Sequence, residues 1–261
     1  MSTTLHKNIA IGKVPPTPTS AEVADKITEH IKEILIREGM SYGFPVGYAQ
    51  EQNGSLIQNI FPVKHLADQQ ISASSKVTLA LHTETAFHPY KPDYLLLLCL
   101  RGDPAAATTY ANLSDILLHL TKECVEILKQ KWFLTGVDIS FRTNNEPDIE
   151  IPISILSQDN SLTSFIYDET VIKPINAEAA YALSVLKKVI PFALKEVVLE
   201  SGDLLVIDNH QTIHGRKPFK PKYDGTDRWL QRLLVRKVLP PSNFIRNGCI
   251  IDVPLHEMKS L

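Results

Sequence analysis

The chain has 261 residues, of which 27 are Lys or Arg and 29 are Asp or Glu, so its formal net charge at pH 7 is −2. A hydrophobic fraction of 44% with 21% charged residues is typical of a folded globular protein and excludes an intrinsically disordered chain. The near-neutral charge gives no general electrostatic reason to bind nucleic acid or an anionic membrane, so we expect a small-molecule partner.

Residues 1–19 contain three prolines and predict an extended arm. They lack the charged and apolar segments of a secretory signal, so we expect the protein in the cytoplasm. The longest uninterrupted apolar stretch, residues 94–100, is much shorter than the roughly 20 residues that span a bilayer. The cysteines form no CxxC pair and are expected to be buried thiols: Cys99, Cys124 and Cys249.

Three amphipathic helices are predicted from apolar residues that recur at helical spacing. The first follows Ser20 and ends at Gly39, with a buried stripe that includes Val23 and Ile27. The second covers about residues 113–131. The third is capped by Asn176 and ends before Pro191.

The remaining apolar runs are short, rich in leucine or β-branched residues, and typical of strands. They cover residues 76–81, 94–100, 137–141, 149–155, 164–167, 196–199, 204–207 and 229–238. Residues 200–203 predict a hairpin turn with Gly202 at positive φ. Because regular helices do not separate the strands, a parallel doubly wound sheet is disfavoured. We expect one mainly β domain over residues 1–261, a jelly roll or β-sandwich with flanking helices.

His82 is followed two residues later by Glu84, and on a strand this spacing places both side chains on one face. The pair can hold one metal ion, although such a match arises easily by chance in a chain with nine histidines. A third ligand would complete the two-histidine, one-carboxylate set that is typical of non-haem Fe(II) oxygenases. Two histidines near the end of a later strand, His210 and His214, compete for that place.

Arg228 and Arg232 are four residues apart in the last predicted strand, so their side chains share one face. Two arginines on a strand are typical of a solvated edge. An inward-facing pair would instead bind carboxylates, because a guanidinium group matches a carboxylate with two parallel hydrogen bonds. The residues alone leave both interpretations open.

Several motifs occur together in one order along the chain. They are QEQNG (50–54), QISASS (70–75), HTETAFH (82–88), residues 92–101, ATT (107–109), YD (167–168), HGR (214–216) and RWLQR (228–232). From about residue 40 to residue 238 the chain thereby resembles the clavaminate synthase-like and taurine dioxygenase-like Fe(II)/2-oxoglutarate-dependent oxygenases, most of all those that hydroxylate free amino acids. The resemblance implies a double-stranded β-helix, or jelly roll. It also implies an enzyme that uses Fe(II), 2-oxoglutarate and O₂ and releases succinate and CO₂.

The resemblance implies a role for each matching residue. His82, Glu84 and His214 would hold the iron, with His214 preferred over His210 because it begins the HGR motif. The 2-oxoglutarate would be bound by Arg228 and Thr109, and the head group of the amino acid by Arg232, Ser72 and Gln52. Related halogenases carry Gly or Ala in place of Glu84, so hydroxylation is expected rather than halide transfer.

Asp168 falls near the position where arginine-hydroxylating relatives keep acids that bind the guanidinium group, although an acid that ends a strand in a turn would look the same. We therefore expect a basic free amino acid as substrate, L-lysine first and then L-arginine or ornithine. Two alternatives stay open: a taurine-type dioxygenase of another small acid, and a non-catalytic jelly-roll binding protein.

Overall fold

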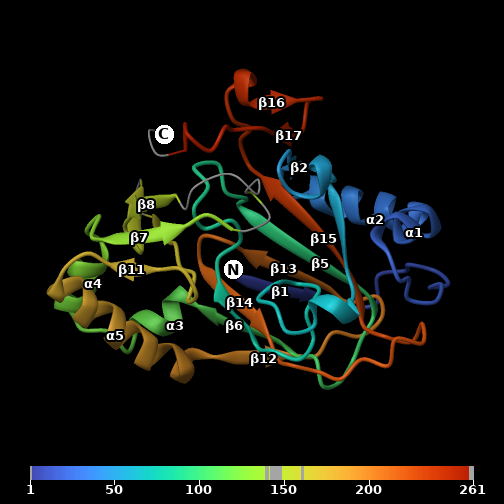
Figure 1. Cartoon of the computed structure of the whole chain (residues 1–261), viewed down its shortest axis with the longest axis horizontal. Coiled ribbons are helices and arrows are strands. Elements are labelled where there is room, and N and C mark those ends of the chain that lie inside the picture. The colour runs from blue at the N-terminus through green and yellow to red at the C-terminus, as the bar shows by residue number, and fades with distance from the viewer. Residues whose placement is uncertain (1, 139–140, 142–148, 160–161, 259–261) are drawn as a thin grey trace.

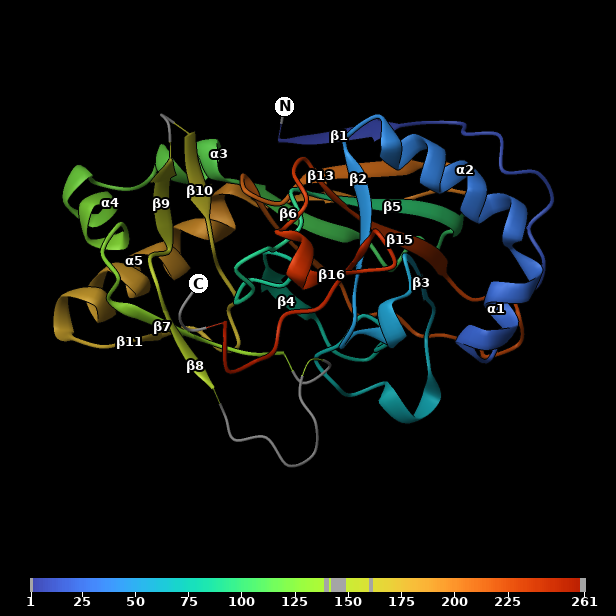
Figure 2. The same ribbon diagram turned by 90° about the horizontal axis from the view of Figure 1, so that it is seen from above.

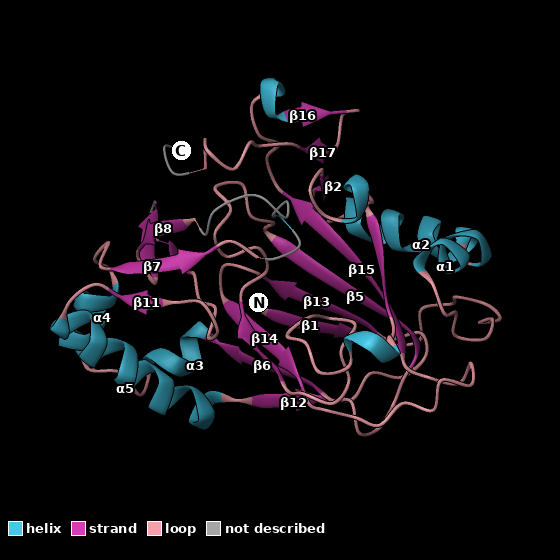
Figure 3. Cartoon of the chain, viewed as in Figure 1, coloured by secondary structure: helices cyan, strands magenta, loops and turns pink. Residues whose placement is uncertain are grey.

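Two sheets form the centre of the molecule in the computed structural model, which describes residues 2–138, 141, 149–159 and 162–258 (Figure 1). The large sheet has the order β1-β13-β5-β15-β2-β17-β16, with β3 also paired to β15, and the small sheet has the order β12-β6-β14-β4. This mainly β architecture, shown in Figure 3, confirms the predicted jelly roll. No helix in the described residues is long and apolar enough to cross a membrane.

The strands of the large sheet are β1 (Thr3–His6), β2 (Phe44–Tyr48), β3 (Ile57–Ile60), β5 (Tyr94–Arg101), β13 (Leu204–Asp208), β15 (Trp229–Arg236), β16 (Ile245–Arg246) and β17 (Ile250–Ile251). Those of the small sheet are β4 (Leu79–His82), β6 (Thr108–Asn112), β12 (Lys195–Val197) and β14 (Thr212–Arg216). Two smaller sheets contain β7 (Phe133–Gly136), β8 (Glu150–Ile153), β9 (Leu156–Asp159), β10 (Leu162–Phe165) and β11 (Lys173–Pro174).

The helices lie at opposite ends of the molecule, as Figure 2 shows. At one end are α1 (Ala21–Ile27) and α2 (Glu29–Met40), and at the other are α3 (Leu113–Leu117), α4 (Lys122–Leu128) and α5 (Ala177–Ala193). Side chains alternate along a strand, so those of β5 point to both faces of the sheet, and each face is covered by a hydrophobic core. Leu96, Leu98 and Leu100 pack in the core beneath α1 and α2, and Leu95, Leu97 and Cys99 pack in the core on the other face.

The helix predicted over residues 20–39 is divided in two at Thr28, whose backbone leaves the helical region (φ −123°). The hydroxyl of Thr28 donates to the carbonyl of Ala24 (2.8 Å) and accepts from Nε2 of Gln231 (2.8 Å). A threonine bonded back to residue i−4 bends a helix, and here a contact from the sheet strengthens that effect. The predicted stripe was also wrong at Val23 and Ile27, which are 46% and 37% exposed.

The second predicted helix is likewise two helices, because Thr121 caps α4 by accepting a hydrogen bond from the N–H of Cys124 (3.2 Å). Asn176 caps α5 as predicted, through the N–H of Ala179 (2.8 Å). However, α5 continues through Pro191, which lies in its last turn. A proline there removes one helical hydrogen bond close to an end that is already incompletely bonded.

Several strand predictions also change. The turn at residues 200–203 has Gly202 at φ +87° as expected, but it joins β12 of the small sheet to β13 of the large sheet and is not a hairpin. The N-terminal arm is partly a strand, since β1 pairs with β13. Strand β7 ends before the predicted strand 137–141, of which residues 139–140 lie outside the described residues. Cys99 and Cys124 are buried, and Cys249 is only partly buried.

Gly39 marks the closest approach of α2 to the large sheet. A Cβ atom added there would lie 2.3 Å from Cδ2 of Leu233 in β15. Gly39→Ala should therefore destabilise the protein by about 1–3 kcal/mol, because the overpacked side chain has to move, even though alanine favours helix. Urea unfolding measures the effect, and an unchanged or higher free energy of unfolding would contradict this packing.

Candidate active site

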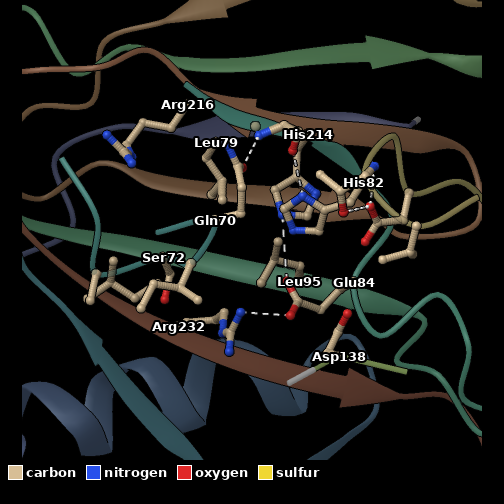
Figure 4. A pocket seen from close by; sticks show the side chains of 18 of the residues that line it. Gln70, Ser72, Leu79, His82, Glu84, Leu95, Asp138, His214, Arg216 and Arg232 are labelled. Atoms are coloured by element: carbon tan, nitrogen blue, oxygen red, sulfur yellow. Dashed lines mark hydrogen bonds and ion pairs between the residues drawn. The ribbon is translucent and has the colours of Figure 1, made fainter. Parts of the chain in front are cut away.

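A cavity of about 740 Å³ lies between the two sheets. The large sheet contributes the side chains of Leu95, Leu230 and Arg232, and the small sheet contributes His82 and His214 (Figure 4). The cavity is therefore built from strands that lie far apart in the sequence. The arrangement places most of the predicted site residues around one space.

Three potential metal ligands meet in this cavity. The ligand atoms of His82, Glu84 and His214 all lie within 4.8 Å of one another. His82 ends β4 and pairs directly with His214 of β14, whose neighbour Gly215 allows the two strands to approach. A Cβ atom at Gly215 would lie 2.5 Å from the carbonyl oxygen of Leu79, so any side chain there would push β4 away. This close pairing brings the two imidazole rings to 4.4 Å between centroids.

The protonation of these side chains suits a metal ion. Nδ1 of His82 faces the carbonyl oxygen of Ala80 (2.9 Å) and therefore carries the proton, which leaves the lone pair of Nε2 free. Burial lowers the pKa of His214 to about 4, so its ring is neutral. Burial opposes ionisation of Glu84, but Arg232 and the two histidines outweigh it and hold the pKa of this carboxyl well below its usual range. The neutral imidazole of His214 and the carboxylate of Glu84 are thus in the ligand states that Fe(II) requires.

The residues also leave a ligand atom without a partner. Oε1 of Glu84 accepts a hydrogen bond from Nη1 of Arg232 (2.7 Å), whereas its buried Oε2 has no hydrogen-bond partner among the described residues. Oε2 lies 3.6 Å from Nε2 of His214. Because an unpaired buried carboxylate oxygen is costly, a cation beside Oε2 would relieve it. The donor set and this free oxygen fit an iron ion.

His210 takes no part in this group. Its Nε2 lies 2.9 Å from Oδ1 of Asp93, and its Nδ1 lies 2.8 Å from Oγ of Ser164. Both ring nitrogens are therefore engaged elsewhere. Of the two histidines, His214 is the one that lies beside His82 and Glu84.

Arg228, directly before β15, and Arg232 within β15 both line the cavity, so a solvated edge is excluded. Arg228 is 6% exposed and lines the cavity, yet within the described part of the chain it makes no hydrogen bond or ion pair. Burial lowers its pKa to about 10, which still leaves the guanidinium charged at neutral pH. A buried cation without a partner is unfavourable. Arg228 is thus a preformed site for an anion.

Arg232, in contrast, bonds the protein through all three guanidinium nitrogens, although only four of its five N–H groups have acceptors among the described residues. Besides Glu84, its Nη2 contacts Oε1 of Glu51 (2.7 Å) and its Nε donates to Oε1 of Gln58 (2.8 Å). Oε2 of Glu51 is buried and has no hydrogen-bond partner in the described residues. A cation and an anion, Arg232 and Glu51, therefore lie side by side in the cavity wall.

Glu51 was missed by the sequence analysis, which selected its neighbour Gln52. The side chain of Gln52 is exposed, although the residue also lines the cavity. Gln52 and Asn53 both have positive φ (46° and 55°), an uncommon conformation for residues other than glycine. This left-handed turn interrupts the alternation of side chains, so the motif at residues 50–54 marks the segment but not the residue that points inward.

The threonine pair gives a similar result. Thr108 of β6 lines the cavity, whereas the predicted Thr109 is buried opposite Gly215 and is not part of the lining. Ser72 lines the cavity in the segment before β4, as Figure 4 shows. The structure thus places Ser72 on the cavity lining. It also makes Thr108, and not Thr109, the lining threonine of this pair.

Two aspartates line the cavity near the iron ligands. The backbone of Asp168 pairs with that of His82 in an isolated antiparallel β-bridge. Oδ1 of Asp168 accepts hydrogen bonds from the N–H (2.8 Å) and the hydroxyl (2.6 Å) of Thr170. Asp138, which lies close to Glu84 in Figure 4, was missed because it fell within a predicted strand. Burial, together with the nearby charge of Asp168, raises the pKa of Asp138 to about 7. Asp138 and Asp168 thus place two carboxyl groups on the cavity lining, close enough for one to raise the pKa of the other.

Comparisons with known proteins agree with this geometry. A family model described as taurine catabolism dioxygenase TauD, TfdA family, matches residues 12–234. The chain is 34% identical to L-asparagine oxygenase of Streptomyces coelicolor (89% of this chain, 70% of the relative) and 31% identical to L-lysine 3-hydroxylase of Catenulispora acidiphila (86% and 64%). A solved structure of asparagine oxygenase with Fe(II), 2S,3S-3-hydroxyasparagine and succinate is similar with a TM-score of 0.86 and 31% identity (97% of this chain, 80% of that chain). The iron oxygenase OrfP with Fe, succinate and (3S)-hydroxy-L-Arg is similar with a TM-score of 0.85 and 29% identity (95% and 80%).

Proposed function

Because the chain belongs to the taurine catabolism dioxygenase TauD, TfdA family, we propose that it hydroxylates an unactivated C–H bond of a basic free amino acid. L-lysine is the first candidate, and L-arginine or ornithine come next. The relatives are amino-acid-hydroxylating oxygenases, and this chain is likewise a dioxygenase that uses Fe(II) and 2-oxoglutarate. The identity of its amino acid is inferred below from the charges that line the cavity.

When bound, iron and 2-oxoglutarate supply the activation of O₂ that breaks the C–H bond, with release of succinate and CO₂. His82, Glu84 and His214 would hold the iron on one side only and leave the remaining positions open. Arg228 would bind the distal carboxylate of 2-oxoglutarate, because its buried guanidinium lacks a partner. A contact of Thr109 with the same molecule stays a prediction, and Thr108 is the threonine on the cavity lining.

The head group of a free amino acid is a zwitterion, and Arg232 and Glu51 offer the matching pair of charges. The substrate carboxylate would accept hydrogen bonds from Arg232, and the substrate ammonium would donate to the free Oε2 of Glu51. Ser72 lies on the same lining and would bind the head group as well. Gln52, which also lines the cavity, stays a predicted contact. Holding both charges of the head group fixes which carbon faces the iron.

The observation that carries the choice of a basic substrate is the pair of carboxyl groups, Asp138 and Asp168, on the cavity lining. A terminal ammonium or guanidinium group would pair with them as a cation, whereas the amide of asparagine carries no charge. A taurine-type dioxygenase of another small acid would need Arg232 but neither aspartate. The side chain of the substrate would therefore extend from Arg232 and Glu51 toward Asp138.

Incubation with free amino acids and taurine, Fe(II), ascorbate, 2-oxoglutarate and air tests this proposal. We expect lysine, arginine or ornithine to gain one oxygen atom by mass spectrometry, in a 1:1 ratio to succinate. Oxidation of asparagine alone would refute the basic substrate, and oxidation of taurine alone would favour the taurine-type alternative. A non-catalytic binding protein would give no product and, under anaerobic conditions, no metal-to-ligand absorption band with Fe(II) and 2-oxoglutarate.

A further inference from the structure

The side chain of Asn209 forms hydrogen bonds with both the N–H and the carbonyl oxygen of Glu84, one of the proposed iron ligands. The residue follows β13, is fully buried, and lies 125 positions from Glu84 in the sequence. Its Oδ1 accepts a hydrogen bond from the N–H of Glu84 (2.7 Å), and its Nδ2 donates to the carbonyl oxygen of Glu84 (3.0 Å). Nδ2 also donates to the carbonyl oxygen of Pro92 (2.9 Å). One side chain therefore satisfies both backbone groups of Glu84.

The backbone at this point needs such support. Strand β4 ends at His82, so Glu84 has no ladder of strand hydrogen bonds. The next residue, Thr85, has φ +47°, which is strained for a β-branched residue. Strain of this kind costs about 1–3 kcal/mol and persists only where surrounding contacts impose it. The amide of Asn209 supplies two of these contacts directly before the strained residue.

The direction of the Glu84 carboxylate matters for the site. Its Oε1 meets Arg232, while Oε2 stays free beside His214. Rotation of the peptide group before or after Glu84 would swing the carboxylate and break this division. We propose that Asn209 is a positioning residue for the iron site, which holds the Glu84 backbone in the strained conformation that presents Oε2 to the metal. The inference rests on iron binding by the triad and does not depend on which amino acid is the substrate.

An asparagine with a purely structural role would stabilise the fold without contacting an iron ligand. Asn59 is such a residue and provides the comparison. Its side chain also makes three hydrogen bonds, to Trp229 Nε1 (3.0 Å), Gln231 Nε2 (3.1 Å) and Asp25 Oδ1 (2.9 Å). Asn59 lies opposite Gln231 in the pairing of β3 with β15, and neither Asn59 nor its partners Trp229 and Gln231 line the cavity. Asn59→Ala therefore removes a comparable amide without touching Glu84.

The test compares Asn209→Ala, Asn209→Asp and Asn59→Ala in the full chain. Asn209→Asp keeps an acceptor for the Glu84 N–H but loses both donors and adds a buried charge. In the metal-free protein, hydrogen exchange at the Glu84 amide should become faster in Asn209→Ala and not in Asn59→Ala. Titration with Mn(II) or anaerobic Fe(II) should show an affinity about 10- to 100-fold lower for both Asn209 variants, as is typical for loss of a residue that orients a metal ligand. The affinity of Asn59→Ala should stay close to that of the wild type.

A second substitution tests the strain itself. Glycine adopts positive φ without penalty, so Thr85→Gly in the Asn209→Ala background should recover part of the metal affinity. Equal affinity losses in Asn209→Ala and Asn59→Ala would overturn the positioning role, and no recovery with Thr85→Gly would overturn its explanation by strain. If the wild type bound no metal, the iron site itself would be wrong, and the exchange rate of the Glu84 amide would still decide whether Asn209 holds this backbone.

Discussion

Arg228→Met is expected to raise the melting temperature of the metal-free protein and, at the same time, to raise the KM for 2-oxoglutarate by about 30-fold or more. The first effect follows because Arg228 is a buried charge without a hydrogen-bond or ion-pair partner in the described residues. An unpaired buried ion costs several kcal/mol, so a methionine of similar length should be favourable. For a chain of this size, each 1 kcal/mol gained corresponds to about 2–4 °C. The second effect follows because the distal carboxylate of 2-oxoglutarate would lose its guanidinium partner.

Arg232→Met is the matched control, since Arg232 lies four residues after Arg228, within β15, and is similarly buried. Its guanidinium pairs with Glu84 and Glu51, so its removal leaves two buried carboxylates unpaired. Breaking a buried pair in this way is expected to destabilise the protein by about 3–5 kcal/mol. The two substitutions should therefore shift the melting temperature in opposite directions. A lower melting temperature and an unchanged KM for Arg228→Met would show that Arg228 serves the fold and not the co-substrate.

Features that depend on local periodicity were predictable from the sequence. Short apolar runs identified β5 and β15, and the period of two placed Arg228 and Arg232 together, as both line the cavity. The same rule paired His82 with Glu84, although β4 ends at His82 and Glu84 reaches the site from the turn that follows. The third ligand, His214, required the resemblance to a known family, because only the pairing of β14 with β4 brings it to His82.

Features that depend on a break in periodicity were not predictable. Glu51 points into the cavity because two residues with positive φ follow it, and Asp138 does so because the chain leaves β7. Thr28 ends α1 partly through a contact with Gln231, which lies 203 residues away. In each case the decisive contact or turn is set by distant segments or by an unusual backbone angle. The same holds for Asn209, whose partner Glu84 is unrelated to it in sequence pattern.

Charged side chains lie at three separate places on the cavity lining, although the net charge of the whole chain is only −2. Arg228 supplies a cation without a partner in the described residues, Arg232 and Glu51 supply a matched pair, and Asp138 and Asp168 supply two carboxyl groups. A dicarboxylate, a zwitterion and a terminal cation are complementary to these three groups. The co-substrate and a basic amino acid together would thus balance the charges of the site.

Asp138→Asn should lower kcat/KM for the basic substrate by about 10- to 100-fold, because a charged hydrogen bond to the terminal cation contributes about 1.5–3 kcal/mol. Turnover of asparagine should stay the same or rise, since its amide does not need the carboxylate. Asp168→Asn is the matched control: Oδ1 of Asp168 already accepts two hydrogen bonds from Thr170, which an asparagine oxygen can retain. We expect a smaller loss for that variant. Equal turnover of lysine, arginine and ornithine by the wild type and Asp138→Asn would remove Asp138 from the substrate site.

The pH dependence of the same variant gives an independent measurement. Since burial and Asp168 raise the pKa of Asp138 to about 7, this carboxyl becomes protonated as the pH falls through neutrality. The protonated form is uncharged and binds a cation less well, so kcat/KM for a basic amino acid should fall on the acidic side. Bound iron adds positive charge nearby and shifts this fall to lower pH. Asp138→Asn cannot titrate and should lack that part of the profile, whereas a profile unchanged by the substitution would assign the acidic limb to another group.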